Sequence, residues 1–170
     1  PLGPGTGQIR MLEDLDGDGR YEKATVFTDK LPFPNGVLPW KDGLLATAAP
    51  NIWFLRDTDG DGRADERRIL FTGFGEGNQQ LRVNGLTWGL DNWIYGANGR
   101  NDGDVRRGGD STTNAISIRR RDFRFRPDTG QFEAIEEEFF RGENKFTEAK
   151  APTVESFEDL DEGEPEPAGF

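Results

Sequence analysis

The most informative part of the chain is the segment NIWFLRDTDGDGRADERRILFT, residues 51–72. Its two ends are short runs of β-branched, aromatic and leucine residues, which favour β-strands. Its centre, DTDGDGRAD at residues 57–65, places aspartates at alternate positions with glycines among them, as is typical of a tight turn. We therefore predict two antiparallel strands joined by an acidic loop.

The same acidic pattern occurs earlier in the chain, as DLDGDGRYE at residues 14–22. Calcium takes six to eight oxygen ligands at about 2.3–2.6 Å, and glycines at positive φ allow alternate carboxylates to turn toward one point. We predict that both loops bind Ca²⁺; the alternative is a pair of solvated turns without a metal, since Asp and Gly are ordinary turn residues. The predicted ligands are the side chains of Asp14, Asp16, Asp18 and Glu22 with the Arg20 carbonyl, and the side chains of Asp57, Asp59, Asp61 and Asp65 with the Arg63 carbonyl.

Neither loop matches an EF-hand. An EF-hand has a bidentate Glu at the twelfth loop position, where this chain has Thr25 and Arg68. The runs that flank the second loop are also too short for paired helices, and their composition is typical of strands. An acidic loop between two strands resembles instead the calcium hairpins of integrin-type β-propellers.

The strand-forming pattern repeats along the chain. Residues 35–49 and 84–98 each show a strand, a turn and a strand, and each is followed by a second hairpin, at residues 52–70 and 116–135. Four strands in a period of about 40–50 residues are typical of β-propeller blades. We therefore predict an all-β fold, a partial β-propeller of about two to three four-stranded antiparallel blades, in which the hairpin at residues 9–27 is the outer half of a preceding blade.

Composition divides the chain in two. Residues 1–140 carry the strand patterns and are predicted to form the propeller domain, interrupted at residues 98–114 by a long polar loop that is either functional or disordered. Residues 141–170 are predicted to be a disordered acidic tail, because residues 155–170 contain seven acids and no Lys or Arg. The net charge is −11 for the whole chain and −4 for residues 1–154, so the tail carries most of it.

Composition also excludes several functional classes. The chain has no His and no Cys, which rules out Ser-His-Asp and Cys-His catalytic sites and the usual zinc ligand sets within it. No catalytic residue is predicted, because no spacing selects one pair among the 32 acids. Nucleic acid is not an expected partner, since the run Arg119–Arg126 alternates Phe and Arg like a half-buried strand and the net charge is negative.

The order of these segments resembles a known family. The relevant runs are LPFPNGVLPW at residues 31–40, AAPNIW at 48–53, LFTGFGEGNQQ at 70–80, TWGLDNWIYGANG at 87–99 and RDFRFRPDTG at 121–130. Together they resemble the membrane-bound dehydrogenases of Planctomycetes and related bacteria, which have an N-terminal propeller similar to the soluble quinoprotein glucose and sorbosone dehydrogenases. The resemblance implies a periplasmic or secreted oxidation of a sugar or alcohol with pyrroloquinoline quinone (PQQ).

Position 81 departs from the family's pattern. The family has a His directly after the run that ends at Gln80, and in the glucose dehydrogenases this His is the base that accepts the substrate hydroxyl proton. Leu81 stands there in this chain, and leucine cannot accept a proton. The resemblance therefore implies a fragment that is inactive alone, with Arg82 and Asn84 as candidate cofactor-binding residues; roles in strand entry and in a turn are the alternative for these two.

Location and partners follow from the same features. Calcium loops without a twelfth-position Glu are expected to bind weakly, at about 10⁻⁴–10⁻³ M, which favours a compartment outside the cytoplasm. No signal peptide or membrane span is present and the chain starts at Pro1, so we expect its beginning to be missing. Expected partners are the remaining blades or a second copy, through exposed strand edges. Two other hypotheses stay open: an active domain completed by other parts of the protein, and an extracellular adhesion or ligand-binding module without catalysis.

Overall fold

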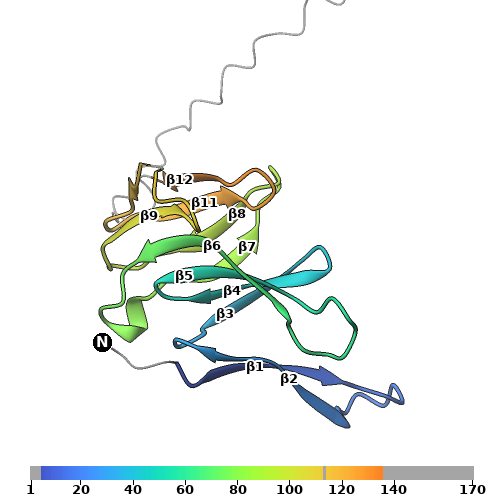
Figure 1. The fold of residues 1–170 in the computed structure, drawn as a ribbon. Coiled ribbons are helices and arrows are strands. Elements are labelled where there is room, and N and C mark those ends of the chain that lie inside the picture. The colour runs from blue at the N-terminus through green and yellow to red at the C-terminus, as the bar shows by residue number, and fades with distance from the viewer. Residues whose placement is uncertain (1–4, 113, 136–170) are drawn as a thin grey trace, which may run out of the picture. The chain divides into compact units, whose positions relative to one another are not determined.

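The computed structural model describes residues 5–112 and 114–135 (Figure 1). Within them every regular element except one short 3-10 helix, η1 (Gln79–Leu81), is a β-strand, and every strand pair is antiparallel. The prediction of an all-β fold is confirmed. The described strands form three sheets, with the orders β1-β2, β10-β9-β6-β5-β4-β3 and β12-β11-β8-β7.

The first sheet is the hairpin of β1 (Gly7–Glu13) and β2 (Lys23–Leu31). Side chains of β1 alternate between half-buried and exposed, which is the pattern of a strand with one face toward a core. The first acidic loop joins the two strands. The hairpin predicted in residues 9–27 is therefore present.

The second sheet is built around two largely buried strands, β4 (Gly43–Ala48) and β5 (Asn51–Arg56). They lie between β3 (Gly36–Trp40) and β6 (Glu66–Phe74), and the four strands follow one another as a meander. The second acidic loop joins β5 to β6. The strands predicted on both sides of this loop are confirmed.

The third sheet is also a meander, with an excursion in its middle. Its strands are β7 (Asn84–Trp88), β8 (Ile94–Ala97), β11 (Asp122–Arg126) and β12 (Gln131–Ile135). In β11 both phenylalanines are fully buried and the other three residues of the strand are half-buried, as the alternation of Phe and Arg predicted.

The polar segment at residues 98–114, predicted to be one long loop, contains a strand. β9 (Gly103–Arg107) pairs with β6, and the short β10 (Ile116–Ser117) pairs with β9. The prediction was wrong because Val105 is the only apolar residue of this strand, although its side chain is buried. Pairing with an existing sheet edge therefore stabilises β9 more than its own side chains do.

The addition of β9 and β10 extends the β3–β6 meander from the four predicted strands to six. The junction needs a glycine. Gly73 in β6 has a φ of 103°, and an added Cβ there would lie 2.1 Å from the Asp104 carbonyl oxygen of β9. Only a residue without a side chain permits this bulge and the close approach of the two strands.

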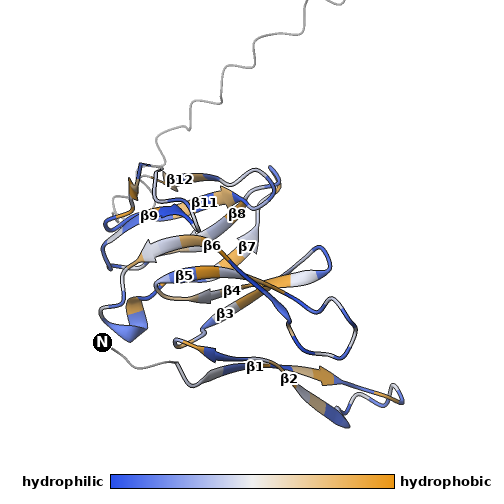
Figure 2. Cartoon of the chain, in the orientation of Figure 1, coloured by the Kyte–Doolittle hydropathy of each residue, from blue (hydrophilic) through white to orange (hydrophobic). Residues whose placement is uncertain are grey.

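The main core contains side chains from both the second and the third sheet. At its centre Phe71 and Phe74 of β6 contact Phe123 and Phe125 of β11 and Phe132 of β12, with ring centroids 5.1 to 6.2 Å apart. Aromatic pairs of this kind add about 0.5–1.5 kcal/mol each beyond the area they bury. Apolar residues are concentrated on the strands of these sheets, while the long connecting loops are hydrophilic (Figure 2).

A smaller core holds the β1–β2 hairpin against the second sheet. Phe27 and Leu31 of β2 pack with Ala46, Ala48 and Leu55 of the second sheet. In the described residues no sheet closes on itself. The predicted acidic tail, residues 141–170, lies outside the described residues.

Candidate metal centre

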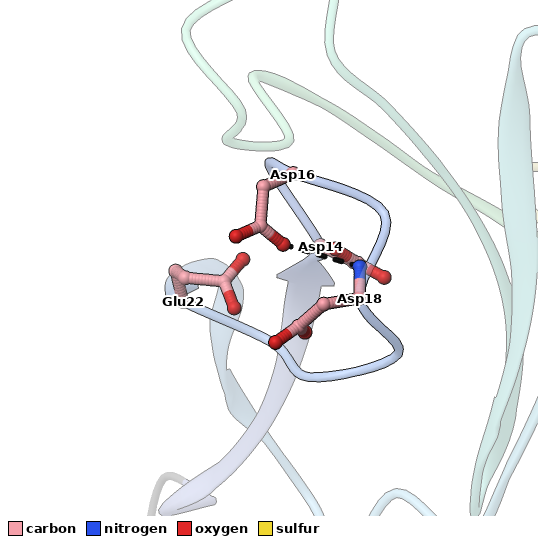
Figure 3. Close-up of side chains that lie close together, drawn as sticks. All are labelled: Asp14, Asp16, Asp18 and Glu22. Atoms are coloured by element: carbon pink, nitrogen blue, oxygen red, sulfur yellow. Dashed lines mark hydrogen bonds between the residues drawn. The ribbon is translucent and has the colours of Figure 1, made fainter.

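The first acidic loop, between β1 and β2, gathers four carboxylates (Figure 3). Asp14, Asp16, Asp18 and Glu22 each offer one carboxylate oxygen, and these oxygens lie within 4.8 Å of one another. All four residues are exposed to solvent. The structure therefore brings together the four side chains that the sequence pattern selected in this loop.

Backbone N–H groups hold the first aspartate at the centre of the turn. Asp14 Oδ1 accepts a hydrogen bond from the Gly17 N–H at 2.7 Å, and Oδ2 accepts one from the Gly19 N–H at 2.9 Å. The chain must curl over the carboxylate to make both bonds. Gly17 and Gly19 allow this, because their φ angles of 78° and 90° lie in the region that favours glycine.

The other acids of the first loop are oriented in the same way. Asp16 Oδ1 accepts from the Asp18 N–H at 3.1 Å, and Asp18 Oδ1 accepts from the Arg20 N–H at 2.8 Å. Glu22 Oε2 accepts from the Leu15 N–H at 2.8 Å, which ties the end of the loop to its start. The second oxygen of each of these three carboxylates accepts no hydrogen bond from the described residues, so it is available to a cation or to water.

The second acidic loop, between β5 and β6, repeats this hydrogen-bond frame. Asp57 accepts from the N–H groups of Gly60 and Gly62, at 2.7 Å in each case. Asp59 and Asp61 each accept from the N–H two residues further on, at 3.2 and 2.8 Å. Carboxylate oxygens of the three aspartates lie within 4.8 Å of one another. One sequence pattern therefore folds in the same way at two places in the chain.

The two loops differ at their ninth position. Glu22 belongs to the cluster of the first loop, whereas Asp65, the predicted equivalent, lies outside the group formed by the second. Asp65 accepts two hydrogen bonds from Thr58, one from the backbone N–H at 3.1 Å and one from the hydroxyl at 2.5 Å. Leu15 occupies the position of Thr58 in the first loop and has no hydroxyl. The Thr58 hydroxyl and the shorter aspartate side chain together keep this carboxylate away from the others.

The surroundings of the loops differ as well. The Ala64 N–H of the second loop donates to the Phe27 carbonyl of β2 at 2.7 Å, and the Ala64 side chain packs against the smaller core. A Cβ added at Gly62 would lie 3.2 Å from Cε of Met11 in β1, whereas one added at Gly19 would meet nothing within 4 Å. The second loop is thus packed against the first hairpin, and the first loop projects into solvent.

Hydrogen bonds favour the ionised form of the loop carboxylates. The Gly19 N–H lowers the pKa of Asp14 below the ordinary aspartate value, and the Gly62 N–H lowers the pKa of Asp57 in the same way. The Thr58 hydroxyl lowers the pKa of Asp65. Because hydrogen bonds to a carboxylate stabilise its charged form, both loops are anionic at neutral pH.

This set of donors fits a hard cation. Each loop offers only oxygen atoms, from three or four carboxylates, and a calcium shell of six to eight oxygens is usually completed by backbone carbonyls and water. The carbonyls of Arg20 and Arg63 stay predicted ligands. The acidic clusters of both loops could therefore hold a metal ion.

Two features of the loops escaped the sequence analysis. The role of Thr58 could have been found by comparing the second positions of the loops, where Leu15 and Thr58 differ in hydrogen-bonding capacity. The contact of Ala64 with Phe27 joins residues of different hairpins and carries no local signal in the sequence.

The residues selected by the family resemblance lie together at the start of β7. Leu81 ends η1, Arg82 follows it, and Asn84 Nδ2 donates to the Arg82 carbonyl at 2.8 Å. Arg82 is 2% exposed, and its guanidinium donates to the Glu76 carbonyl at 2.8 Å and lies 5.3 Å from the Phe33 ring centroid. Each of the two polar side chains therefore makes one hydrogen bond within the protein, and the buried Arg82 Nε has no hydrogen-bond partner among the described residues. Arg82 and Asn84 stay predicted cofactor-binding residues.

Three antiparallel sheets and two equivalent acidic turns define an all-β domain with two candidate metal-binding loops. A family model described as a domain of unknown function (DUF7133) matches residues 1–149, and the chain belongs to this family. Comparisons with curated proteins and with solved structures gave no match. Among the described residues there is no helix with the length and apolar character needed to cross a membrane.

Proposed function

We propose that this chain is a calcium-binding β-propeller module, related to the quinoprotein sugar and alcohol dehydrogenases but inactive alone. The observation that carries the proposal is the repeated loop frame. Two turns in different sheets hold alternate aspartates with the same backbone hydrogen bonds and bring their oxygens within 4.8 Å of one another. A single acidic turn is common on protein surfaces. Two turns with the same pattern and the same hydrogen bonds are best explained if each binds the same kind of ligand.

Calcium fits these loops better than the other common metal ions. Zinc prefers Cys and His ligands, and the chain has neither. Magnesium demands near-octahedral geometry and usually keeps several waters. A turn with three or four carboxylates in an exposed, irregular arrangement suits the larger and more adaptable coordination shell of calcium.

The bound cation has a structural role. In its absence each loop holds several like charges close together, and like charges repel one another even in water. A cation between them replaces this repulsion with attraction and fixes the ends of the two strands that the loop joins. In the second loop the same ion also supports the contact with the β1–β2 hairpin, because Ala64 and Gly62 of that loop form it.

The blade architecture is supported by the order of the strands. β3–β6 and β7-β8-β11-β12 are both four-stranded antiparallel meanders, which is the form of a propeller blade. Their first strands also meet, since a Cβ added at Gly36 of β3 would lie 3.8 Å from the Gly85 nitrogen of β7. Neighbouring blades approach each other in this way around a central channel.

Catalysis, in this proposal, belongs to a completed ring. The base that accepts the proton of a sugar or alcohol substrate would come from residues beyond those described here, because Leu81 cannot accept a proton. Arg82 and Asn84 stay the candidate residues for binding PQQ. The protein acts in the periplasm or outside the cell, where calcium is plentiful enough to fill weak sites.

Thermal unfolding in millimolar calcium and in excess chelator tests the proposal. A ligand that binds only the folded state raises its stability by RT ln(1 + [L]/Kd), so we expect a higher Tm in calcium. The double variant Asp59→Ala/Asp61→Ala should lose much of this shift, and Asp29→Asn, an exposed acid of β2 outside both loops, should keep it. Equal Tm values of the unaltered protein in calcium and chelator would contradict the proposal.

The alternative of an adhesion or ligand-binding module relied on an open loop at residues 98–114. β9 occupies residues 103–107 of that segment and is paired on both sides. No other observation among the described residues favours this alternative over the calcium-supported blade.

A further inference from the structure

Arg82 is the only charged residue that is buried in the part of the chain that the structure describes, with 2% of its surface exposed. Within that part no carboxylate lies at ion-pair distance from its guanidinium. Arg56 and Arg124, which are more exposed, each form ion pairs with two carboxylates. Because an unpaired buried charge is costly, the position of Arg82 calls for a functional explanation.

The Arg82 guanidinium keeps hydrogen-bond donors that the fold does not use. Its Nη2 donates to the Glu76 carbonyl at 2.8 Å, which is a neutral acceptor. The buried Nε has no partner among the described residues. The planar fork of an arginine matches the two oxygens of a carboxylate, and such a pair also neutralises the charge. A carboxylate is therefore the ligand group that this side chain fits best.

The ring of Phe33 lies over the guanidinium, with its centroid 5.3 Å from Arg82 Cζ. Phe33 itself is 46% exposed, so movement of this one ring would open the arginine to solvent. The two residues lie in the segments that lead into β3 and β7. In the proposed blades these are the innermost strands, which line the central channel of a propeller. The pair thus lies at one end of that channel.

The backbone of Phe33 is strained. Its φ of 49° lies in the left-handed region, which a bulky side chain rarely adopts. Phe33 also stands between Pro32 and Pro34, and a residue before proline favours an extended backbone. Strained residues of this kind cluster at ligand sites and switches. A change of Phe33 to the extended conformation would relieve the strain and carry its ring away from Arg82.

We propose that Arg82 binds a carboxylate of a small molecule and that Phe33 is a cover that moves aside to admit it. This inference rests on the proposed function, which makes Arg82 a candidate for binding PQQ, and it adds the charge of the ligand group and the residue that controls access. The carboxylate belongs either to the cofactor or to a sugar acid that serves as substrate. In both cases its oxygens accept hydrogen bonds from the guanidinium.

The NMR signal of the Arg82 Nε–H group tests the proposal on the full chain, and Arg82→Lys assigns that signal by removing it. The first probe is glucuronate, and glucose at equal ionic strength is its neutral control. PQQ is titrated separately. We expect a saturable shift of the Nε–H signal with a carboxylate probe and none with glucose. A shift with PQQ alone assigns the carboxylate to the cofactor, and a shift with glucuronate alone assigns it to a sugar acid.

Variants separate the roles of the two residues in isothermal titration with the probe that binds. Phe33→Ala removes both the cover and its strain and should tighten binding about tenfold. Arg82→Lys keeps the charge but loses the planar fork and should weaken binding about tenfold. Tyr21→Ala, at an exposed aromatic residue of the first acidic loop, is the control and should leave the affinity unchanged.

Three results would overturn the proposal. No binding of either carboxylate probe by the unaltered protein and by Phe33→Ala would exclude the site. Equal affinity in Arg82→Lys and in the unaltered protein would place the ligand elsewhere. Binding by Phe33→Ala but not by the unaltered protein would show that Phe33 is a fixed part of the fold and does not act as a moving cover.

The result can be separated from that of the calcium proposal. The probes are titrated in millimolar calcium, and calcium binding by the same samples is followed through the shift in Tm. Protein that responds to calcium and binds no carboxylate contradicts the Arg82 site alone. Protein that binds a carboxylate probe and does not respond to calcium contradicts the calcium proposal alone.

Discussion

The two acidic loops share a sequence pattern and a hydrogen-bond frame, but they lie in different surroundings. The first projects into solvent from the end of the β1–β2 hairpin and gathers four acids. The second gathers three, because Thr58 binds Asp65, and it packs against that hairpin through Ala64. The comparison shows that local sequence determines the frame of a loop, whereas its neighbours determine what a bound ion stabilises.

Alanine at equivalent glycines should give the largest difference between the loops. Gly19 and Gly62 have φ angles of 90° and 84°, where a side chain costs about 1–2 kcal/mol. Only Gly62 also has a neighbour, Met11 Cε, 3.2 Å from an added Cβ. Because crowding adds to the backbone strain, we expect Gly62→Ala to lower the free energy of unfolding by about 2–3 kcal/mol and Gly19→Ala by about 1–2 kcal/mol.

Urea denaturation of both glycine variants in chelator measures these losses without a contribution from metal. Equal losses in the two variants would mean that the contact between the second loop and the first hairpin contributes nothing to stability.

The next difference concerns the response to calcium. At a free calcium concentration of about ten times Kd, a loop that binds only in the folded state adds about 1.4 kcal/mol by mass action. The first loop can fray without disturbing the sheets, since its residues are exposed, so part of its binding survives partial unfolding. We expect Asp59→Ala/Asp61→Ala to remove more of the calcium-dependent rise in Tm than Asp16→Ala/Asp18→Ala.

Differential scanning calorimetry in calcium and in chelator compares the two double variants directly. A larger loss from the first-loop variant would reverse the assignment of the structural role to the second loop.

Exchanging the second-position residues should alter calcium affinity in opposite directions. Thr58→Val removes the hydroxyl that holds Asp65, and Leu15→Thr introduces a hydroxyl beside Glu22. One hydrogen bond contributes about 0.5–1.5 kcal/mol, or about a 2- to 12-fold change in an equilibrium constant. We expect tighter binding by the second loop in Thr58→Val and weaker binding by the first loop in Leu15→Thr.

Thr58→Ser is the matched control, because it keeps the hydroxyl and should retain the original affinity. Isothermal titration with calcium measures all three variants. Unchanged affinity in Thr58→Val would show that Asp65 is not kept from the ion by Thr58.

The smallest expected effect is on the dependence of stability on pH. Folding lowers the pKa of Asp14, Asp57 and Asp65. The folded protein therefore binds fewer protons than the unfolded chain, so the ionised carboxylates stabilise the folded state. This stabilisation is complete above the ordinary aspartate pKa of about 3.9, and it is lost as the pH falls through the pKa values of the folded protein. In chelator, we expect the urea concentration at the midpoint of unfolding to decrease when the pH is lowered below about 4. Asp57→Asn should make this decrease smaller.

Most strands of this fold could be predicted because they carry their own signal. β5 contains a run of consecutive apolar residues, and in β11 phenylalanine alternates with charged residues. The core buries most of these apolar side chains. β9 could not be predicted in the same way, since Val105 is its only apolar residue and its stability comes from pairing with β6, a strand distant in the sequence. A pattern based on side chains does not detect a strand that is stabilised mainly through its backbone.

The candidate site shows the same limit. The acids of the first loop could be selected from sequence, because the frame that gathers them depends on local glycines and N–H groups. The displacement of Asp65 depends on the hydroxyl of Thr58, at a position where the first loop has Leu15. The packing of Ala64 against Phe27 depends on the position of another hairpin, which no local pattern encodes.

The most direct test of the central claim is a calcium titration followed by the backbone amide signals of Gly17, Gly19, Gly60 and Gly62 in NMR spectra. The N–H groups of these residues bind the first aspartate of each loop, so an ion at either cluster must change their environment. We expect all four signals to shift and saturate by millimolar calcium, with one apparent Kd for each loop. Signals that stay fixed throughout the titration would contradict calcium binding and reduce both loops to acidic turns.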